Sequence, residues 1–446
     1  MNRTTTVSLL IAALAGVPAV RGQAPEPRPI DLRQAIARAL ERSPEIGVSR
    51  AEADEAHAVA RLADAAFRPE AYATTTPGYS SGLPIQVAGQ VPAIAGLSLR
   101  KTIYDPSRRA EAFESRVRAA SLDGVREQSV IETVRAVAAA YGRNWSGETL
   151  LADARRRLEI QEASLRRTSA LAREGRQTDL DVERAGLEVA RAKQKLLDAQ
   201  SERSLDQLEL KRLLDWPAGE PLTLSGDPLE ALPRPEPDNF ELARAADPEL
   251  KALAQESLSL RAAAGLYERS WRPVVEAEAR YLRLASYNNF DQYFVKFKEN
   301  DFAVGVSVVM PLWTGGRQAE ARASAHARLE RLEAAQRARE KNVELSARRA
   351  EAELLHAEAQ KALAQRAEAL AREDRRVIQL LADEGRAEPA EVDKREIALA
   401  DAEDDSAIAN QGLLTARVKL LALTGRLPGV SPDSVRPTTA AVAEIR

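Results

Sequence analysis

The chain contains no cysteine, and only three of its 446 residues are histidine, namely His57, His326 and His356. The missing thiols exclude disulfide bonds, thiolate metal sites and lipid attachment to cysteine. Aromatic residues make up only 4% of the chain, whereas charged residues make up 29%. That balance is typical of long helices that face solvent, and it disfavours a compact globule with a thick core.

The sequence also lacks the patterns that mark common functional classes. A formal net charge of −3 argues against nucleic-acid binding, which normally needs a basic stripe. No nucleophile elbow, phosphate loop, metal-ligand cluster or histidine dyad is present, so we predict no enzyme, no cofactor and no metal site. The many carboxylates alternate with arginines at helical spacing, as they do on solvated helix faces.

Long apolar runs are missing too, apart from a short one at the start of the chain. Arg3 precedes apolar residues 7–14, which are followed by small residues and Pro18. This order is typical of a secretory signal peptide over residues 1–22, with cleavage after Gly22. No later run reaches the ~18 apolar residues of a membrane helix. We therefore predict an exported chain with no helical membrane anchor.

The stretch 173–181 predicts the tip of a long antiparallel helical hairpin. Gly175 suits a helix C-terminus, where the chain often turns through a left-handed conformation. Thr178, followed three residues later by Asp181, has the pattern of a capping box that begins the returning helix. No proline occurs between Pro106 and this tip, so the helix that reaches it is predicted to be roughly 100 Å long.

A second copy of this tip follows 210 positions later, over residues 383–391. Gly385 takes the place of Gly175, Pro389 pre-sets the first helical turn, and Glu388 replaces the usual Ser or Thr cap. Other landmarks repeat at nearly the same offset, including Pro44 with Pro248, Pro69 with Pro273, and Tyr104 with Trp313. The chain is therefore predicted to be an internal duplication.

The duplication divides the chain after the signal peptide into two structural repeats, 23–230 and 231–446. In the first we expect strands over about 70–104 and a helical hairpin over about 106–214. In the second we expect strands over about 274–313, a hairpin over about 317–423, and a C-terminal tail. The first strand near residue 70 is poorly marked, so we expect an irregular first β-hairpin.

The second repeat carries the clearer strand pattern, because apolar residues alternate with small or polar ones over 302–308 and 275–281. Each run is about the length that a tilted strand needs to cross a bilayer. One apolar and one polar face are typical of a membrane barrel, and a half-buried strand in a soluble sheet is the alternative. Four strands cannot close a barrel, and open edges do not occur in lipid, so a membrane role requires oligomers. A trimer would supply twelve strands.

These features resemble the TolC family of outer-membrane efflux proteins. The resemblance rests on the tandem repeat, on Pro-Leu-Trp-Thr-Gly-Gly-Arg at 311–317, and on Gly-x-x-Thr-x-x-Asp-Val at 175–182 with Ala185. It implies a mainly α fold in which a trimeric 12-stranded β-barrel in the outer membrane continues into a periplasmic α-helical barrel. The implied function is a passive exit channel of a tripartite efflux or type I secretion system.

The resemblance also implies partners and site residues. The partners are a homotrimer, outer-membrane lipid, a periplasmic adaptor (membrane fusion protein), and an inner-membrane pump of the RND, ABC or MFS type. The resemblance does not identify the exported substrate, because a wide polar duct has little selectivity of its own. The residues expected at the adaptor-contacting tips are Gly175, Arg176, Thr178, Gly385, Arg386 and Glu388.

A closed periplasmic aperture in this family is lined by acids just after the tips, which by position are Asp181 and Glu391. Three copies of each would form a ring that attracts cations. The alternative is that both are helix N-terminal acids favoured by the macrodipole. Lys394 stands where the family has a second acid, which argues against a double acidic ring. We expect Lys394 to pair with a neighbouring carboxylate.

A soluble periplasmic coiled-coil scaffold or adaptor is the alternative function. Export and heptad-like seams fit it equally well. It does not explain why strands occur at matching places in both repeats.

Overall fold

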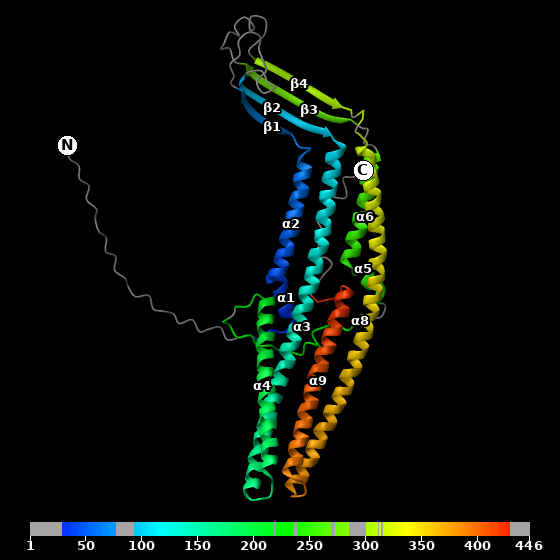
Figure 1. Cartoon of the computed structure of the whole chain (residues 1–446). Helices are drawn as coiled ribbons and strands as arrows, with labels where there is room; N and C mark the ends of the chain where they lie inside the picture. The colour runs from blue at the N-terminus through cyan, green and yellow to red at the C-terminus, as the bar shows by residue number, and fades with distance from the viewer. Residues whose placement is uncertain are drawn as a thin grey trace, which may run out of the picture.

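The computed structural model describes residues 29–76, 93–217, 219–235, 239–268, 273–284, 300–310, 312–313 and 315–428. The expected signal peptide, the C-terminal tail beyond residue 428, and residues 311 and 314 of the 311–317 motif lie outside the described residues. Figure 1 shows a rod with a small sheet at one end and two helical tips at the other.

Four helices form most of the rod, in two hairpins of nearly equal size. The first consists of α3 (Pro106–Arg173, 68 residues) and α4 (Asp179–Leu213, 35 residues). The second consists of α8 (Arg317–Asp383, 67 residues) and α9 (Pro389–Leu423, 35 residues). These bounds follow the predicted punctuation, since Pro106 and Pro389 open helices and a glycine follows each long helix.

Shorter helices complete the half of the rod nearest the sheet. They are α1 (Leu32–Arg42), α2 (Pro44–Ala65), α5 (Asn239–Ala246) and α6 (Pro248–Glu268). Helix α3 packs against α2, α4, α6 and α9, while α8 packs against α5, α6 and α9. The helices therefore lie side by side in the order α2, α3, α6, α8 near the sheet and α4, α3, α9, α8 near the tips (Figure 1).

The main core lies midway along the rod, where α1, α3, the end of α4 and α9 meet. Its largest fully buried side chains are Tyr141, Val134, Val137, Leu32, Ile36, Leu210, Leu214, Leu414, Leu420 and Leu421. Tyr141 ties two distant segments to α3, because its hydroxyl donates to the carbonyl oxygens of Ile30 (3.1 Å) and Ser225 (2.7 Å). The helices gain stability here mainly from packing an apolar stripe.

The sheet contains four antiparallel strands in the order β1-β2-β3-β4. They are β1 (Glu70–Thr76), β2 (Ala93–Tyr104), β3 (Val274–Leu284) and β4 (Asn300–Val309). Its first hairpin is irregular, as expected, with a register shift between Thr74 and Thr76. The two hairpins, which are about 200 residues apart in sequence, join where β2 pairs with β3.

One face of the sheet is apolar and the other is polar. In the register of β3 and β4, Val304 lies opposite Ala279 and Val306 lies opposite Ala277. The opposite face carries charged groups, among which Arg100 lies 3.9 Å from Glu278. The described part of the chain is thus mainly helical with a small two-faced sheet. None of the helices in that part is both long and apolar enough to span a membrane.

Candidate functional site: the two tips and the sheet

The first tip turns through glycine at the end of α3. Gly175 has a φ of +71°, a left-handed conformation that side-chain-bearing residues rarely adopt. The amide of Arg176 donates to the Leu171 carbonyl (2.9 Å) and the amide of Gly175 donates to the Ala172 carbonyl (2.9 Å). This pair of bonds is a Schellman motif, which satisfies two of the last free carbonyls of the helix.

The returning helix α4 begins with the capping box that the sequence predicts. The Thr178 hydroxyl oxygen accepts from the Asp181 amide (3.3 Å), and the Asp181 carboxylate accepts from the Thr178 amide (3.1 Å). The Thr178 hydroxyl also donates to Asp181 (2.7 Å). These hydrogen bonds from Thr178 hold the pKa of the Asp181 carboxyl below its usual value. Asp181 therefore stays ionised while it caps the helix.

The second tip repeats the turn with different capping groups. Gly385 has a φ of +70°, and the amides of Arg386 and Gly385 donate to Leu381 (2.8 Å) and Ala382 (2.9 Å). Glu388 occupies the N-cap of α9 without a side-chain capping bond, and Pro389 follows it. The backbone geometry of the first tip is thus reproduced without its capping box.

Glu391 and Lys394 form an ion pair on the first turn of α9, with Nζ 2.6 Å from Oε1. The ammonium group of Lys394 lowers the pKa of Glu391 by its hydrogen bond first and by its charge second. This agrees with the expectation that Lys394 pairs with a neighbouring acid. Glu391 thus has a cation in direct contact, whereas Arg184 lies 3.5 Å from Asp181.

The tips present matching arginines to solvent. The side chains of Arg176 and Arg386 are each 70% exposed, and each lies near the glutamate two residues before it, at 3.6 and 3.2 Å. Both tips lie at the end of the rod away from the sheet (Figure 1). The fold thus brings all nine predicted tip and aperture residues to one end of the molecule.

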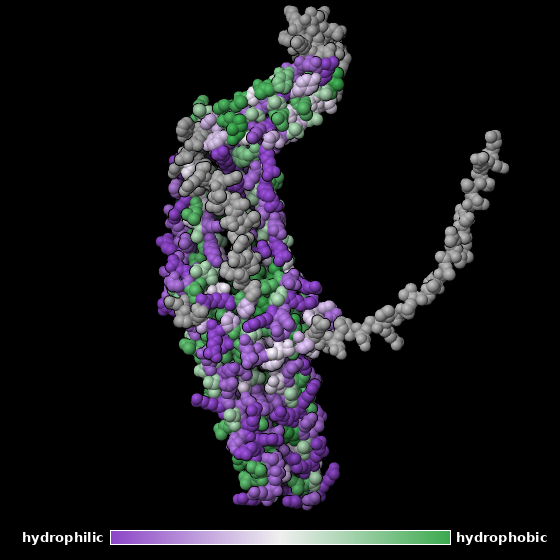
Figure 2. Space-filling model, turned by 180° about the vertical axis from the view of Figure 1, so that it is seen from behind, coloured by the Kyte–Doolittle hydropathy of each residue, from purple (hydrophilic) through white to green (hydrophobic). Residues whose placement is uncertain are grey.

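The sheet end carries the exposed apolar surface. On β4, Phe302 is 72% exposed and Val304 is 68% exposed, and at the junction with α8 Trp313 is 88% exposed. Figure 2 shows hydrophobic residues gathered over this end and hydrophilic residues along the rod. The alternative of strands half-buried in a soluble core therefore does not apply to β4, whose side chains are nearly all exposed.

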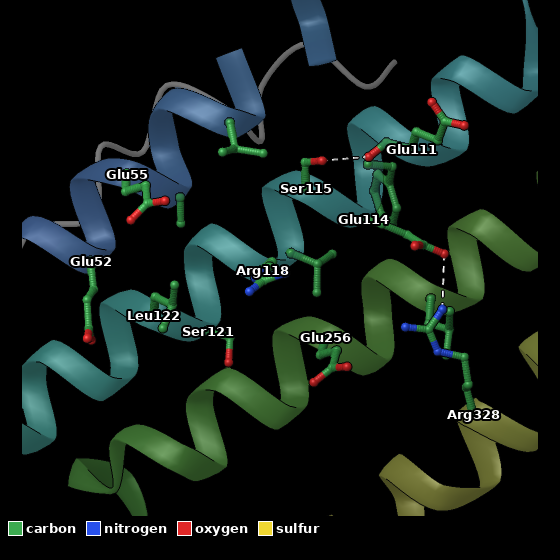
Figure 3. Close-up of a pocket in the computed structure, with 15 residues that line it drawn as sticks. Glu52, Glu55, Glu111, Glu114, Ser115, Arg118, Ser121, Leu122, Glu256 and Arg328 are labelled. Carbon is green, nitrogen blue, oxygen red and sulfur yellow. Dashed lines mark hydrogen bonds and ion pairs between the residues drawn. The ribbon is translucent and has the colours of Figure 1, made fainter. Parts of the chain in front are cut away.

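Two further features did not emerge from the sequence. An open crevice of about 960 Å³ lies between α2, α3, α6 and α8 (Figure 3). It is lined by glutamates that include Glu52, Glu55 and Glu256, and Arg328 at its edge contacts Glu114 at 3.1 Å. Within the described residues, no cluster of histidine and acidic side chains is arranged to hold a metal ion.

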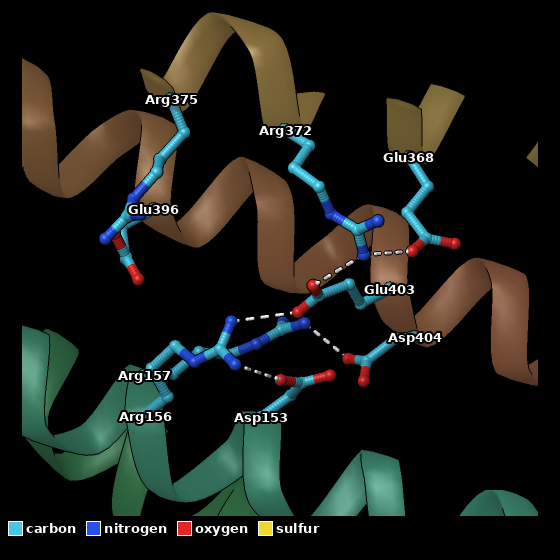
Figure 4. A network of polar contacts seen from close by, with 9 residues as sticks. All are labelled: Asp153, Arg156, Arg157, Glu368, Arg372, Arg375, Glu396, Glu403 and Asp404. Carbon is cyan, nitrogen blue, oxygen red and sulfur yellow. Dashed lines mark hydrogen bonds and ion pairs between the residues drawn. The ribbon is translucent and has the colours of Figure 1, made fainter. Parts of the chain in front are cut away.

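The second such feature is a network of charges between α3 and α9 (Figure 4). Arg156 bonds Glu403 at 2.9 Å, Arg157 bonds Asp401 at 2.5 Å, and Arg167 pairs with Asp393 nearer the tips. In the sequence these residues look like any solvated helix face. Only the pairing of helices from opposite repeats identifies them as an interface.

Comparison with known proteins accounts for this arrangement. Residues 35–215 match the model of the outer membrane efflux protein family. The matched residues lie within the first of the two repeats. This match favours an outer-membrane efflux protein over an enzyme or a soluble scaffold. No curated protein sequence is similar enough to the chain to count as a match.

Solved channels of this kind share the fold over most of the chain. CusC aligns with a TM-score of 0.72 at 15% identity, covering 88% of this chain and 92% of that one. CmeC of Campylobacter jejuni gives 0.71 at 12% identity, with 89% and 85% covered. The open-state channel MtrE of Neisseria gonorrhoeae gives 0.71 at 17% identity, with 89% of each covered. At these identities the likeness concerns the fold.

Proposed function

We propose that three copies of this chain form a passive exit duct for efflux, with one shared 12-stranded barrel and one shared helical tube. The observation that supports this most directly is the two-faced sheet. Among the described residues, β1 and β4 each pair on one side only, and the exposed face of β4 is apolar. An apolar sheet with open edges satisfies its backbone in lipid only if other copies close it.

The lengths of the elements fit a duct that crosses both a bilayer and the space beneath it. Strands β2, β3 and β4 have 12, 11 and 10 residues, and a tilted transmembrane strand needs about 9–11. Helix α3 extends roughly 100 Å from the sheet at ~1.5 Å per residue. The tips would therefore lie deep in the periplasm, within reach of an adaptor linked to an inner-membrane pump of the RND, ABC or MFS class.

Two substitutions of adjacent residues on β4 test the membrane barrel. Val306→Arg places a charge on the apolar face and should cost about 2–4 kcal/mol at the bilayer midplane. The matched control Ser307→Arg lies on the polar face and should be tolerated, because that face lines water. Outer-membrane fractionation and native mass in detergent should show a membrane trimer for the wild type and for Ser307→Arg. The amount of this trimer should fall for Val306→Arg. A wild-type protein that washes off as a monomer would contradict the duct.

We further propose that Asp181 and Glu391 line the periplasmic aperture. In a trimer, three copies of Asp181 would form an acidic ring, while Lys394 offsets the charge of Glu391. The double variant Asp181→Ala with Glu391→Ala should raise single-channel conductance and weaken block by divalent cations in planar bilayers. Glu183→Ala, at an exposed acid on a different face of α4, serves as the control. Unchanged conductance in the double variant would remove these residues from the aperture.

The tips are also the proposed site of adaptor contact. Charge reversal at Arg176 and Arg386 should weaken adaptor binding and export while leaving trimers intact, because both side chains are exposed and their turns are held by backbone bonds. Arg191→Glu, on α4 away from the tip, is the control. Co-purification of adaptor and channel gives the readout, and equal recovery of the adaptor with the tip variant would argue against this site.

A further inference from the structure

Two carboxyl groups from opposite hairpins meet inside the charge network between α3 and α9. Asp153 comes from α3 and Asp404 comes from α9, and their side chains are 2% and 22% exposed. Figure 4 shows the two carboxyl groups pointing toward one another. A buried carboxylate is unfavourable unless its oxygens receive hydrogen bonds or face a cation.

Their arginine neighbours satisfy only part of this need. Arg157 bonds one oxygen of Asp404, and Arg156 lies 3.6 Å from one oxygen of Asp153. The remaining oxygens, Oδ2 of Asp153 and Oδ1 of Asp404, are buried and have no donor. The two side chains are close enough to share a hydrogen bond. Two ionised carboxylates cannot form that bond, because each is only an acceptor.

The charges around this pair do not favour two ionised groups. Asp401 and Glu403 on α9 add two negative charges. On α8, Glu368 adds a third negative charge and pairs with Arg372, which also lies 3.4 Å from Glu403. Against these carboxylates stand Arg156, Arg157 and Arg372. On α4, Lys193 pairs with Glu162 and Arg203 pairs with Glu148, at other levels of α3.

Burial therefore dominates the titration of the pair. It raises the pKa of Asp404 to about 6, with Asp153 and Asp401 adding to the rise and Arg157 opposing it. Burial also raises the pKa of Asp153, where Arg156 acts in the opposite direction. The pair that joins the two repeats thus holds a proton below about pH 6 and loses it above.

We propose that Asp153 and Asp404 share one proton across the α3–α9 interface, and that loss of this proton loosens the contact between the two hairpins. With the proton in place, the oxygens are joined by a hydrogen bond. Without it, two like charges face each other in a largely buried site. As regulation of the duct, this inference rests on the proposed function, because the hairpins carry the tips that form the aperture.

The absence of cysteine allows a direct test in the full-length protein. Spin labels at Glu159→Cys on α3 and Asp405→Cys on α9, both exposed positions, report the distance between the helices in detergent. The distance should be shorter and more uniform at pH 5 than at pH 8, with a transition near pH 6. A distance distribution that is unchanged between these pH values would overturn the proposal without any further variant.

Substitutions within the network identify the proton site. Asp153→Asn and Asp404→Asn each supply an amide donor in place of the shared proton, so each should keep the short distance at both pH values and lose the transition. Asp393→Asn removes an acid from the same interface, where Arg167 is its partner, and should retain the transition. A transition that persists in both pair variants, or disappears in Asp393→Asn, would contradict the assignment.

The outcomes for the pair and for the duct can be told apart, because the distance measurement needs neither adaptor nor pump. An outer-membrane trimer without the pH transition would overturn the proton pair alone. A transition in a protein that is neither trimeric nor in the outer membrane would overturn the duct alone.

Discussion

The two hairpins have almost the same length and the same turn, yet the long helix of one and the short helix of the other supply most of their largest fully buried side chains. In the first hairpin the long helix α3 carries the core, with Val134, Val137 and Tyr141 fully buried. In the second hairpin the short helix α9 does so, with Leu414 and Leu421 each 1% exposed. Because α3 and α9 are the inner helices of the wall, burial follows place in the wall rather than place in the repeat.

The two tips share a backbone turn but differ in the side chains that cap their helices. Both turn through a left-handed glycine with the same pair of backbone hydrogen bonds. The first adds a capping box from Thr178 and Asp181, and the second adds Pro389 and an ion pair between Glu391 and Lys394. The turn is therefore set by glycine and backbone bonds, and the side-chain caps are interchangeable additions.

The largest expected effect comes from removing an inner side chain of α9. Leu414→Ala should lower the free energy of unfolding by about 2–5 kcal/mol, because the side chain is buried against α3 at Gly142. Ile408→Ala on the same helix should cost less than about 0.5 kcal/mol, since Ile408 is 55% exposed. Denaturant unfolding followed by circular dichroism measures both, and similar losses would contradict the inner position of α9.

A smaller effect should separate the two tips. Thr178→Ala removes the capping box and should destabilise the first turn of α4 by about 1 kcal/mol, whereas Glu388→Ala should be nearly neutral. Glu388→Thr should stabilise the second tip, because Glu391 is correctly spaced to complete a box. Hydrogen exchange of the amides of residues 180–183 and 390–393 gives the readout. Equal exchange in both alanine variants would show that the box adds nothing.

The smallest effect concerns the titration of the two tip acids. Both have a lowered pKa, so each contribution to stability is present above the ordinary carboxyl values of 3.8 and 4.5 and is lost as pH falls through the lowered pKa. Thr178→Ala should raise the pKa of Asp181 alone, and Lys394→Ala should raise that of Glu391 alone. Carboxyl carbon NMR of selectively labelled protein measures both. If Thr178→Ala also changed the pKa of Glu391, or Lys394→Ala that of Asp181, the tips would be electrostatically coupled.

Local chemistry explains why much of this fold is readable from the sequence. Gly175 and Gly385 end helices because other residues are strained there, and Thr178 with Asp181 starts one through hydrogen bonds that span three residues. The alternation over β3 and β4 separates an apolar from a polar face. The first strand is poorly marked in the sequence, because Glu70–Thr76 has weak alternation and gains its register from β2.

The sequence by itself determined the helix ends, the tips and the two faces of the sheet, because each depends on residues that are close together in the chain. It also determined the duplication, because the same landmarks recur in the same order. Only the tertiary structure decided which helices are inner ones and that Asp153 is buried beside Asp404, about 250 residues away. On a helix of alternating charges every acid looks solvated. Whether it loses water depends on which distant helix packs against it.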